Sequence, residues 1–297
     1  MEQLSAPAGV ALKNILVATD FSASSVSALA CVVGIAQASD SLIHILHVIR
    51  PPEIAIASPE AEADISEQKQ RDAQRELGPL ETVVGSVPHK IWLREGDVWT
   101  AIDSLVRSEQ IDLIAVGASG KSDFKKFLVG SVAEEIIRKA TPPVLSVGPH
   151  ALRNSGGASP LSQLLYVTNL WEDSHHGLQY AIQMAIRYRS RLVLLHVVEQ
   201  EEPKQSDHEW LSAYRRILRN LVPESAADLA SEPIVRIEVA KHPTGRILQV
   251  ADEIGANLVV MDVRPEEAWA THLRDKVYDI ISWTNCPVLT VRTSNQA

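Results

Sequence analysis

The chain has 297 residues, of which 45% are hydrophobic, and its 37 acidic residues outnumber 28 basic ones to give a net charge of -9. This balance argues against an extended nucleic-acid surface, which must neutralise many phosphates. No stretch approaches the roughly 18 consecutive apolar residues of a membrane span, and Met1 to Asn14 lack the basic and apolar regions of a signal peptide. We therefore expect a cytoplasmic protein of about two domains, without nucleic-acid or membrane partners.

The first half of the chain alternates short apolar runs with helical patterns. We expect strands near residues 14–18, 42–48, 89–93, 113–117 and 144–147, and helices near 24–38, 62–77, 98–109 and 131–140. Continuous apolar strands separated by helices are typical of a parallel sheet that is covered on both faces. The predicted fold class is therefore α/β, a doubly wound domain with five parallel strands in the order 3-2-1-4-5.

The second half repeats the first. Asp20 and His47 each have a counterpart 149 positions later, Asn169 and His196, in similar apolar surroundings. Further along the chain the offset is 145, so one short indel separates the two halves. The segment between them is rich in turn-forming residues and lacks apolar periodicity. We expect two tandem domains of the same fold, residues 1–149 and 161–297, joined by a linker over 150–160.

A glycine pattern follows the fourth expected strand of the first half. Gly117 and Gly120 come directly after an apolar run, and nine residues later Gly130 and Ser131 open a helix. Backbone N–H groups at a glycine-rich strand end and at a helix N-terminus can together surround a polyphosphate. Asp20 leaves the first strand, which neighbours the fourth in this strand order, at the place where ligands bind in such sheets. The two signals predict one nucleotide-binding cleft.

These motifs, together with His47-Val48, resemble the ATP-binding kind of universal stress protein, here as a tandem pair. The resemblance implies ATP, with or without Mg²⁺ on its phosphates, and a role as a nucleotide-dependent regulator in the stress response. It places the adenine and ribose near Asp20 and Val48 and the phosphates near the glycines. The binding residues that it implies are Asp20, Val48, Val116, Gly117, Gly120, Gly130, Ser131 and Val132.

The second half departs from this pattern. At the positions of the three motif glycines and Ser131, the second half has Asp262, Pro265, Asp275 and Lys276. At the position of Asp20 it has Asn169. Aspartates place negative charge at expected phosphate positions, and proline removes a backbone donor. We expect the second domain to be a structural partner of the first, or a site for something other than ATP.

Two other functions compete with the nucleotide-binding regulator. The run from Ala115 to Lys121-Ser122 fits a permissive P-loop pattern, which would give a slow ATPase using Lys121, although the strict motif begins with glycine. Alternatively, the cleft binds a non-nucleotide ligand and the chain is an interaction module. We identify no catalytic constellation and no metal-ligand set in the sequence.

The sequence also predicts an assembly. The fifth strand of each half is apolar and lies at an edge of its sheet: Val144 to Val147 in the first half and Val288 to Val291 in the second. Such edges promote aggregation when they are left unpaired. We expect them to pair antiparallel within the chain and form an internal pseudo-dimer. A further homodimer of the whole chain and an unidentified protein partner are compatible with this arrangement.

Overall fold

The computed structural model describes residues 12–51, 59–118, 129–151, 161–170, 176–201, 208–263 and 271–292. The first half contains β1 (Asn14–Ala18), α1 (Ala23–Ser39), β2 (Leu42–Ile49), α2 (Pro59–Val84), β3 (His89–Glu95), α3 (Val98–Ser108), β4 (Leu113–Gly117), α4 (Ser131–Lys139) and β5 (Val144–Val147). The second half contains β6 (Gln163–Val167), α5 (His176–Tyr188), β7 (Arg191–Glu199), α6 (His208–Leu221), the 3-10 helix η4 (Glu224–Asp228), β8 (Ile234–Ala240), α7 (Pro243–Glu253), β9 (Leu258–Val263), α8 (Thr271–Trp283) and β10 (Val288–Arg292).

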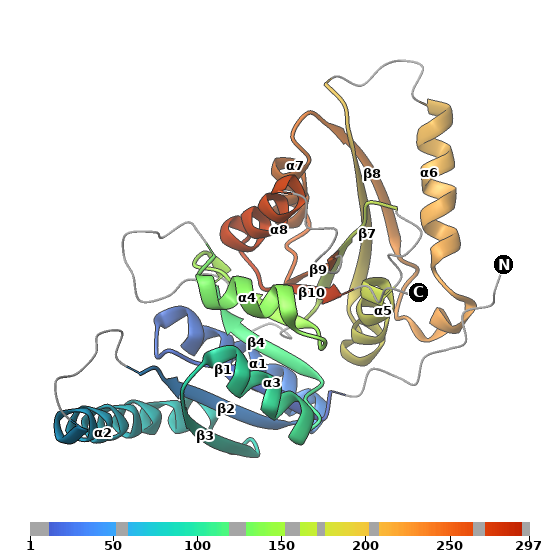
Figure 1. The fold of residues 1–297 in the computed structure, drawn as a ribbon. Coiled ribbons are helices and arrows are strands. Elements are labelled where there is room, and N and C mark those ends of the chain that lie inside the picture. Colours follow the sequence, from blue (N-terminus) through green and yellow to red (C-terminus); the bar gives the residue numbers. More distant parts are fainter. Residues whose placement is uncertain are drawn as a thin grey trace.

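All of these strands form one sheet with the order β3-β2-β1-β4-β5-β10-β9-β6-β7-β8. Each half has the order 3-2-1-4-5, and its strands are parallel, which confirms the predicted fold class. In Figure 1 the first half (blue to green) and the second half (yellow to red) lie side by side. The structure therefore contains two doubly wound domains that share a continuous sheet.

The halves join through β5 and β10, which pair antiparallel with Leu145 opposite Leu289. This confirms the predicted pairing of the two fifth strands. Two hydrophobic clusters run across both halves, one beneath α1, α2 and α5 and the other beneath α3, α4, α7 and α8. A hydrogen bond of 2.8 Å between the hydroxyls of Ser39 and Tyr188 adds a polar contact between α1 and α5. The junction is thus part of the core of the molecule.

Helix α2 differs from its expected range of 62–77, because it continues through Pro79 to Val84. Proline removes one backbone hydrogen bond and disfavours a helix interior. Leu80 and Val84 are nevertheless buried against the core. Their burial explains why the helix continues past the proline.

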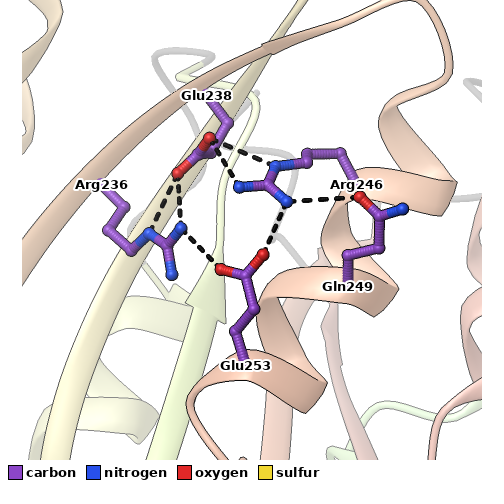
Figure 2. A network of polar contacts seen from close by, with 5 residues as sticks. All are labelled: Arg236, Glu238, Arg246, Gln249 and Glu253. Carbon is purple, nitrogen blue, oxygen red and sulfur yellow. Dashed lines mark hydrogen bonds and ion pairs between the residues drawn. The ribbon is translucent and has the colours of Figure 1, made fainter.

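The two outer strands of the sheet, β3 and β8, carry different kinds of side chain. On β8, Arg236 and Glu238 form a network of ion pairs with Arg246 and Glu253 of α7 (Figure 2). The strand register aligns Arg236 with Leu195, just as it aligns Trp92 of β3 with Leu46 in the first half. An aromatic side chain at one edge is therefore replaced by charged side chains at the other.

Within the described part of the chain, no helix is both long and apolar enough to cross a bilayer.

Candidate functional site

Asp20 lies directly beyond β1, in a turn that leads into α1. The backbone N–H of Ser22 donates to Asp20 Oδ1 at 3.0 Å, and the N–H of Phe21 donates to Thr19 Oγ1 at 3.0 Å. Phe21 has a φ of 62°, which is unusual for a residue other than glycine. Ser22 is the N-cap of α1, a role that its position before an apolar helical pattern makes recognisable. The turn holds one oxygen of the exposed Asp20 carboxylate, and Oδ2 has no hydrogen-bond partner among the described residues.

His47 supports this turn from the neighbouring strand β2. Its Nδ1 lies 2.8 Å from the carbonyl oxygen of Thr19, so Nδ1 carries the proton and donates it. Its ring also packs on that of Phe21, with 4.2 Å between centroids. His196 makes the same contact with Thr168 in the second half, and burial lowers the pKa of its imidazole. The recurrent histidines are therefore structural supports of the two turns.

Gly117 ends β4 where the first turn of α1 crosses it. A Cβ atom at this position would lie 2.5 Å from the backbone nitrogen of Ser25 and 2.6 Å from Ser24. Real Cβ atoms essentially never approach other atoms so closely. Helix–strand packing therefore requires glycine here, a reason that the sequence pattern alone does not reveal. A role for Gly117 in phosphate binding remains a prediction.

Gly130 is the N-cap of α4 and closes the glycine loop. Its N–H donates to the carbonyl oxygen of Ala118 at 2.8 Å, which brings the start of α4 next to the end of β4. Glycine has no side chain with which to cap the helix, and the N–H groups of Ser131, Val132 and Ala133 have no hydrogen-bond partner among the described residues. This helix end can therefore accept an anion. No sequence signal identifies the Ala118 carbonyl, because every residue carries one.

The remaining expected site residues fall into two groups. Val48, Val116 and Val132 pack in the same hydrophobic cluster, on the α3 and α4 face of the sheet. Gly120 lies outside the described residues, as do the lysines of the glycine loop, including Lys121.

The topology brings the two ends of the site together. β1 and β4 are paired in parallel, with Ala18 opposite Val116, so Asp20 and Gly117 leave the sheet at the same edge. β1 also pairs with β2 on its other side, and the connections leave in opposite directions at this point. This is the position at which doubly wound sheets bind ligands. No cluster of three or more potential metal-ligating side chains occurs in the described ranges.

The corresponding place in the second half is built differently. Asp262, at the position of Gly117, accepts hydrogen bonds from the hydroxyl of Tyr166 at 2.6 Å and from the N–H of Gly177 at 2.7 Å. A Cβ on Gly177 would lie 2.8 Å from this carboxylate, so the close approach to glycine is now on the helix and not on the strand. The carboxylate of Asp262 thus lies against α5, which offers it an N–H group, and the expectation that its charge opposes a phosphate stays a prediction.

The start of α8 also differs from that of α4. α8 begins at Thr271, so Asp275, which matches Gly130 in sequence, lies inside the helix and not at its N-cap. Lys276 reaches from α8 to the end of β7, where its Nζ lies 2.9 Å from Glu199 Oε2. Glu199 stands at the position of Arg50 in the first half. An ion pair thus connects the two elements that in the first half flank the expected nucleotide. Pro265 lies outside the described residues.

Comparisons with known proteins agree with this repeated architecture. The model of the Universal stress protein family matches residues 11–148 and again 162–292. Universal stress protein MJ0531 of Methanocaldococcus jannaschii is 29% identical over 46% of this chain and 81% of its own length, and MJ0577 of the same organism is 28% identical over 46% of this chain and 96% of its own. A universal stress protein structure from Archaeoglobus fulgidus covers 97% of this chain and 99% of its own, with 20% identity and a TM-score of 0.69. At that identity, this last likeness concerns the fold.

Proposed function

Because the chain belongs to the universal stress protein family, we propose that it binds ATP in its first half and acts as a nucleotide-dependent regulator in the stress response. The observation that carries this proposal is the hydrogen bond from Gly130 to Ala118, which brings the uncapped end of α4 to the end of β4. An uncapped helix N-terminus favours phosphate through its free N–H groups and its positive dipole end.

Asp20 supplies the second part of the proposed site. Its open Oδ2 atom can accept a hydrogen bond from an adenine amino group or a ribose hydroxyl. Val48 and Val132 are half-buried on the same side of the sheet and suit the apolar face of a base, whereas Val116 is buried in the core on that side. Ser131 is exposed at the helix start and can donate its hydroxyl to a phosphate.

Mg²⁺ would bind in this proposal through the phosphates and water. This ion usually keeps several waters and takes only one or two protein carboxylates. No three-residue ligand set occurs among the described residues. The nucleotide is a bound ligand in this proposal and not a substrate, and we propose no catalytic residue.

We further propose one ATP per chain. In the second half, Lys276 and Glu199 connect α8 to β7, and the position of Gly130 lies within a helix. Among the described residues of the second half, the position that matches Gly130 therefore offers no helix N-terminus for a phosphate. It acts in this proposal as the structural partner of the first half.

Calorimetry with ATP tests this function. We expect one site per chain in the wild type and no binding by Gly130→Asp, because the new carboxylate faces the free N–H groups that the phosphates need. Gly245→Asp is the matched control, since Gly245 lies in the first turn of α7 in the second half with open space around it. Two equivalent sites per chain, or equal loss in both variants, contradicts the proposal.

Two measurements separate the competing functions. Mass spectrometry of the freshly purified protein should find bound nucleotide, whereas an interaction module for another ligand would carry none. Lys121→Ala should weaken ATP binding by no more than about 1 kcal/mol, the scale of a surface charge contact, and a steady-state ATPase assay of both proteins should show no robust activity. A robust activity that this change abolishes would favour the P-loop ATPase.

A further inference from the structure

The last strand of the second half places a cation on the carboxyl end of α4. Arg292 ends β10, and its Nη1 donates to the carbonyl oxygen of Lys139 at 3.2 Å. Lys139 is the last residue of α4. The last carbonyl groups of a helix lack partners within it and carry partial negative charge, so a guanidinium group is stabilising there. The contact joins the second half to the helix that begins at the proposed phosphate site.

The position that matches Arg292 on the other side of the junction carries no charge. The antiparallel pairing centres on Leu145 and Leu289, and the residue that matches Arg292 across this centre is Gly148. Gly148 packs its backbone so closely on the carbonyl group of Ile281 in α8 that a Cβ would collide with it. Of these two matching positions, only the one that contacts the first half, which keeps the glycine motif, is an arginine.

Helix α4 is short, so charges at its two ends lie close enough to interact. Its nine residues span about 13 Å at the usual rise per residue. Its last turn is fixed by an ion pair of 2.7 Å between Lys139 and Glu135, and Lys139 also lies over the ring of Trp99. An anion at the amino end and a cation at the carboxyl end also attract each other directly, by about 1 kcal/mol per unit charge at this separation and an effective dielectric of about 20.

We propose that Arg292 makes the second domain a regulator of the nucleotide site in the first. This inference rests on the proposed function and adds to it: the contact of Arg292 with the end of α4 raises the affinity for the nucleotide. Because such coupling is reciprocal, nucleotide binding also strengthens the junction. A change that removes this contact would then weaken nucleotide binding without touching any residue of the site.

The test is calorimetry with ATP on the full chain at low ionic strength. Arg292→Gln keeps an amide donor and removes the charge, so we expect its dissociation constant to rise about two- to fivefold, because the phosphates lose the attraction of a cation about one helix length away. Arg292→Lys keeps the charge and should fall between this variant and the wild type. Lys241→Gln is the control, because it removes a cation of the second domain that pairs with Glu201 and not with α4.

Hydrogen exchange gives the reciprocal readout. ATP should slow amide exchange in β10 of the wild type, and this slowing should be smaller in Arg292→Gln. If wild-type protein binds ATP and Arg292→Gln binds it equally well, the coupling is wrong while the proposed function stands. If the wild type binds no nucleotide, the function and the coupling fall together. Because Arg292→Gln also removes a stabilising cap, its apo form should be slightly less stable than that of Lys241→Gln. Cooperative unfolding of both variants well above the assay temperature excludes general unfolding as the cause of a weaker affinity.

Discussion

Gly117 and Ser25 approach each other so closely that a Cβ on residue 117 would lie 2.5 Å from the backbone nitrogen of Ser25. The first glycine of the motif thus lets α1 pack on the end of β4. The turn that holds Asp20 immediately precedes this helix, so the same contact fixes where Asp20 lies relative to β4. Packing and the proposed site are therefore linked at one residue.

Gly117→Ala should destabilise the protein even when no nucleotide is present. Inserting a methyl group into a tight contact costs about 1–3 kcal/mol. Gly245→Ala is the control, because a Cβ there meets nothing within 4 Å and alanine is the better helix former. Urea unfolding of the apo forms measures both. A Gly117→Ala protein as stable as the wild type would mean that the backbone at this contact relaxes easily.

Glu238→Gln should destabilise the sheet edge formed by β8 and α7. This carboxylate accepts from both Arg236 and Arg246, and its side chain is only 20% exposed. Its loss leaves two guanidinium groups with one carboxylate, that of Glu253 (Figure 2). We expect a loss of about 1–2 kcal/mol, less than for a fully buried pair because solvent screens part of the interaction.

The matched control for that change is Glu67→Gln on α2. Glu67 pairs with Arg71, but its side chain is 66% exposed. An exposed pair at this helical spacing contributes about 0.3–0.5 kcal/mol. Chemical denaturation at low and high salt distinguishes the two sites. Equal effects of the two substitutions would show that the network adds nothing beyond a surface ion pair.

His44 should make the stability of the first half depend on pH. It is fully buried, its Nδ1 accepts from Trp92 Nε1 at 3.2 Å, and its Nε2 lies 3.3 Å from Asn14 Oδ1. Burial lowers the pKa of His44 from its usual 6.5; the Glu109 carboxylate opposes this effect and Lys90 adds to it. The folded imidazole is therefore held neutral.

The sign of the pH effect follows from that lowered pKa. Below about pH 6.5 the unfolded chain takes up a proton at this histidine that the folded chain resists, so the free energy of unfolding falls as the pH falls, by at most about 1.4 kcal/mol per pH unit. Urea unfolding between pH 5 and 7 should show a smaller slope for His44→Gln than for the wild type. Identical slopes would mean that other groups carry the dependence.

A fragment that ends at Pro149 should self-associate or aggregate. It exposes the edge of β5, which in the full chain is covered by β10. The full-length protein needs no partner chain to cover this edge. Sedimentation velocity compares the two, and a stable, well-behaved monomeric fragment would count against the importance of the pairing.

The sequence by itself determined the fold class, the duplication and the pairing of the halves. Strands that are buried on both faces have continuous apolar sequences, and an apolar edge strand that stays unpaired tends to aggregate. The strands and their pairing can therefore be recognised from local sequence patterns. The adjacency of Asp20 and Gly117 also followed, because strand order alone places them at one edge. The end of α2 did not follow, since the burial of Leu80 and Val84 outweighs the helix-breaking signal of Pro79.

Only the tertiary structure decided where side chains and backbone groups point across those strands. The packing of Gly117 on Ser25, the turn of Asp262 toward Tyr166 and α5, and the cap that Arg292 places on α4 all join residues distant in sequence. Each depends on the distance and orientation between two elements after they pack, and no local periodicity encodes these quantities. The pattern of the sequence therefore located the candidate site, whereas the contacts that support it arise from the packing of helices on the sheet.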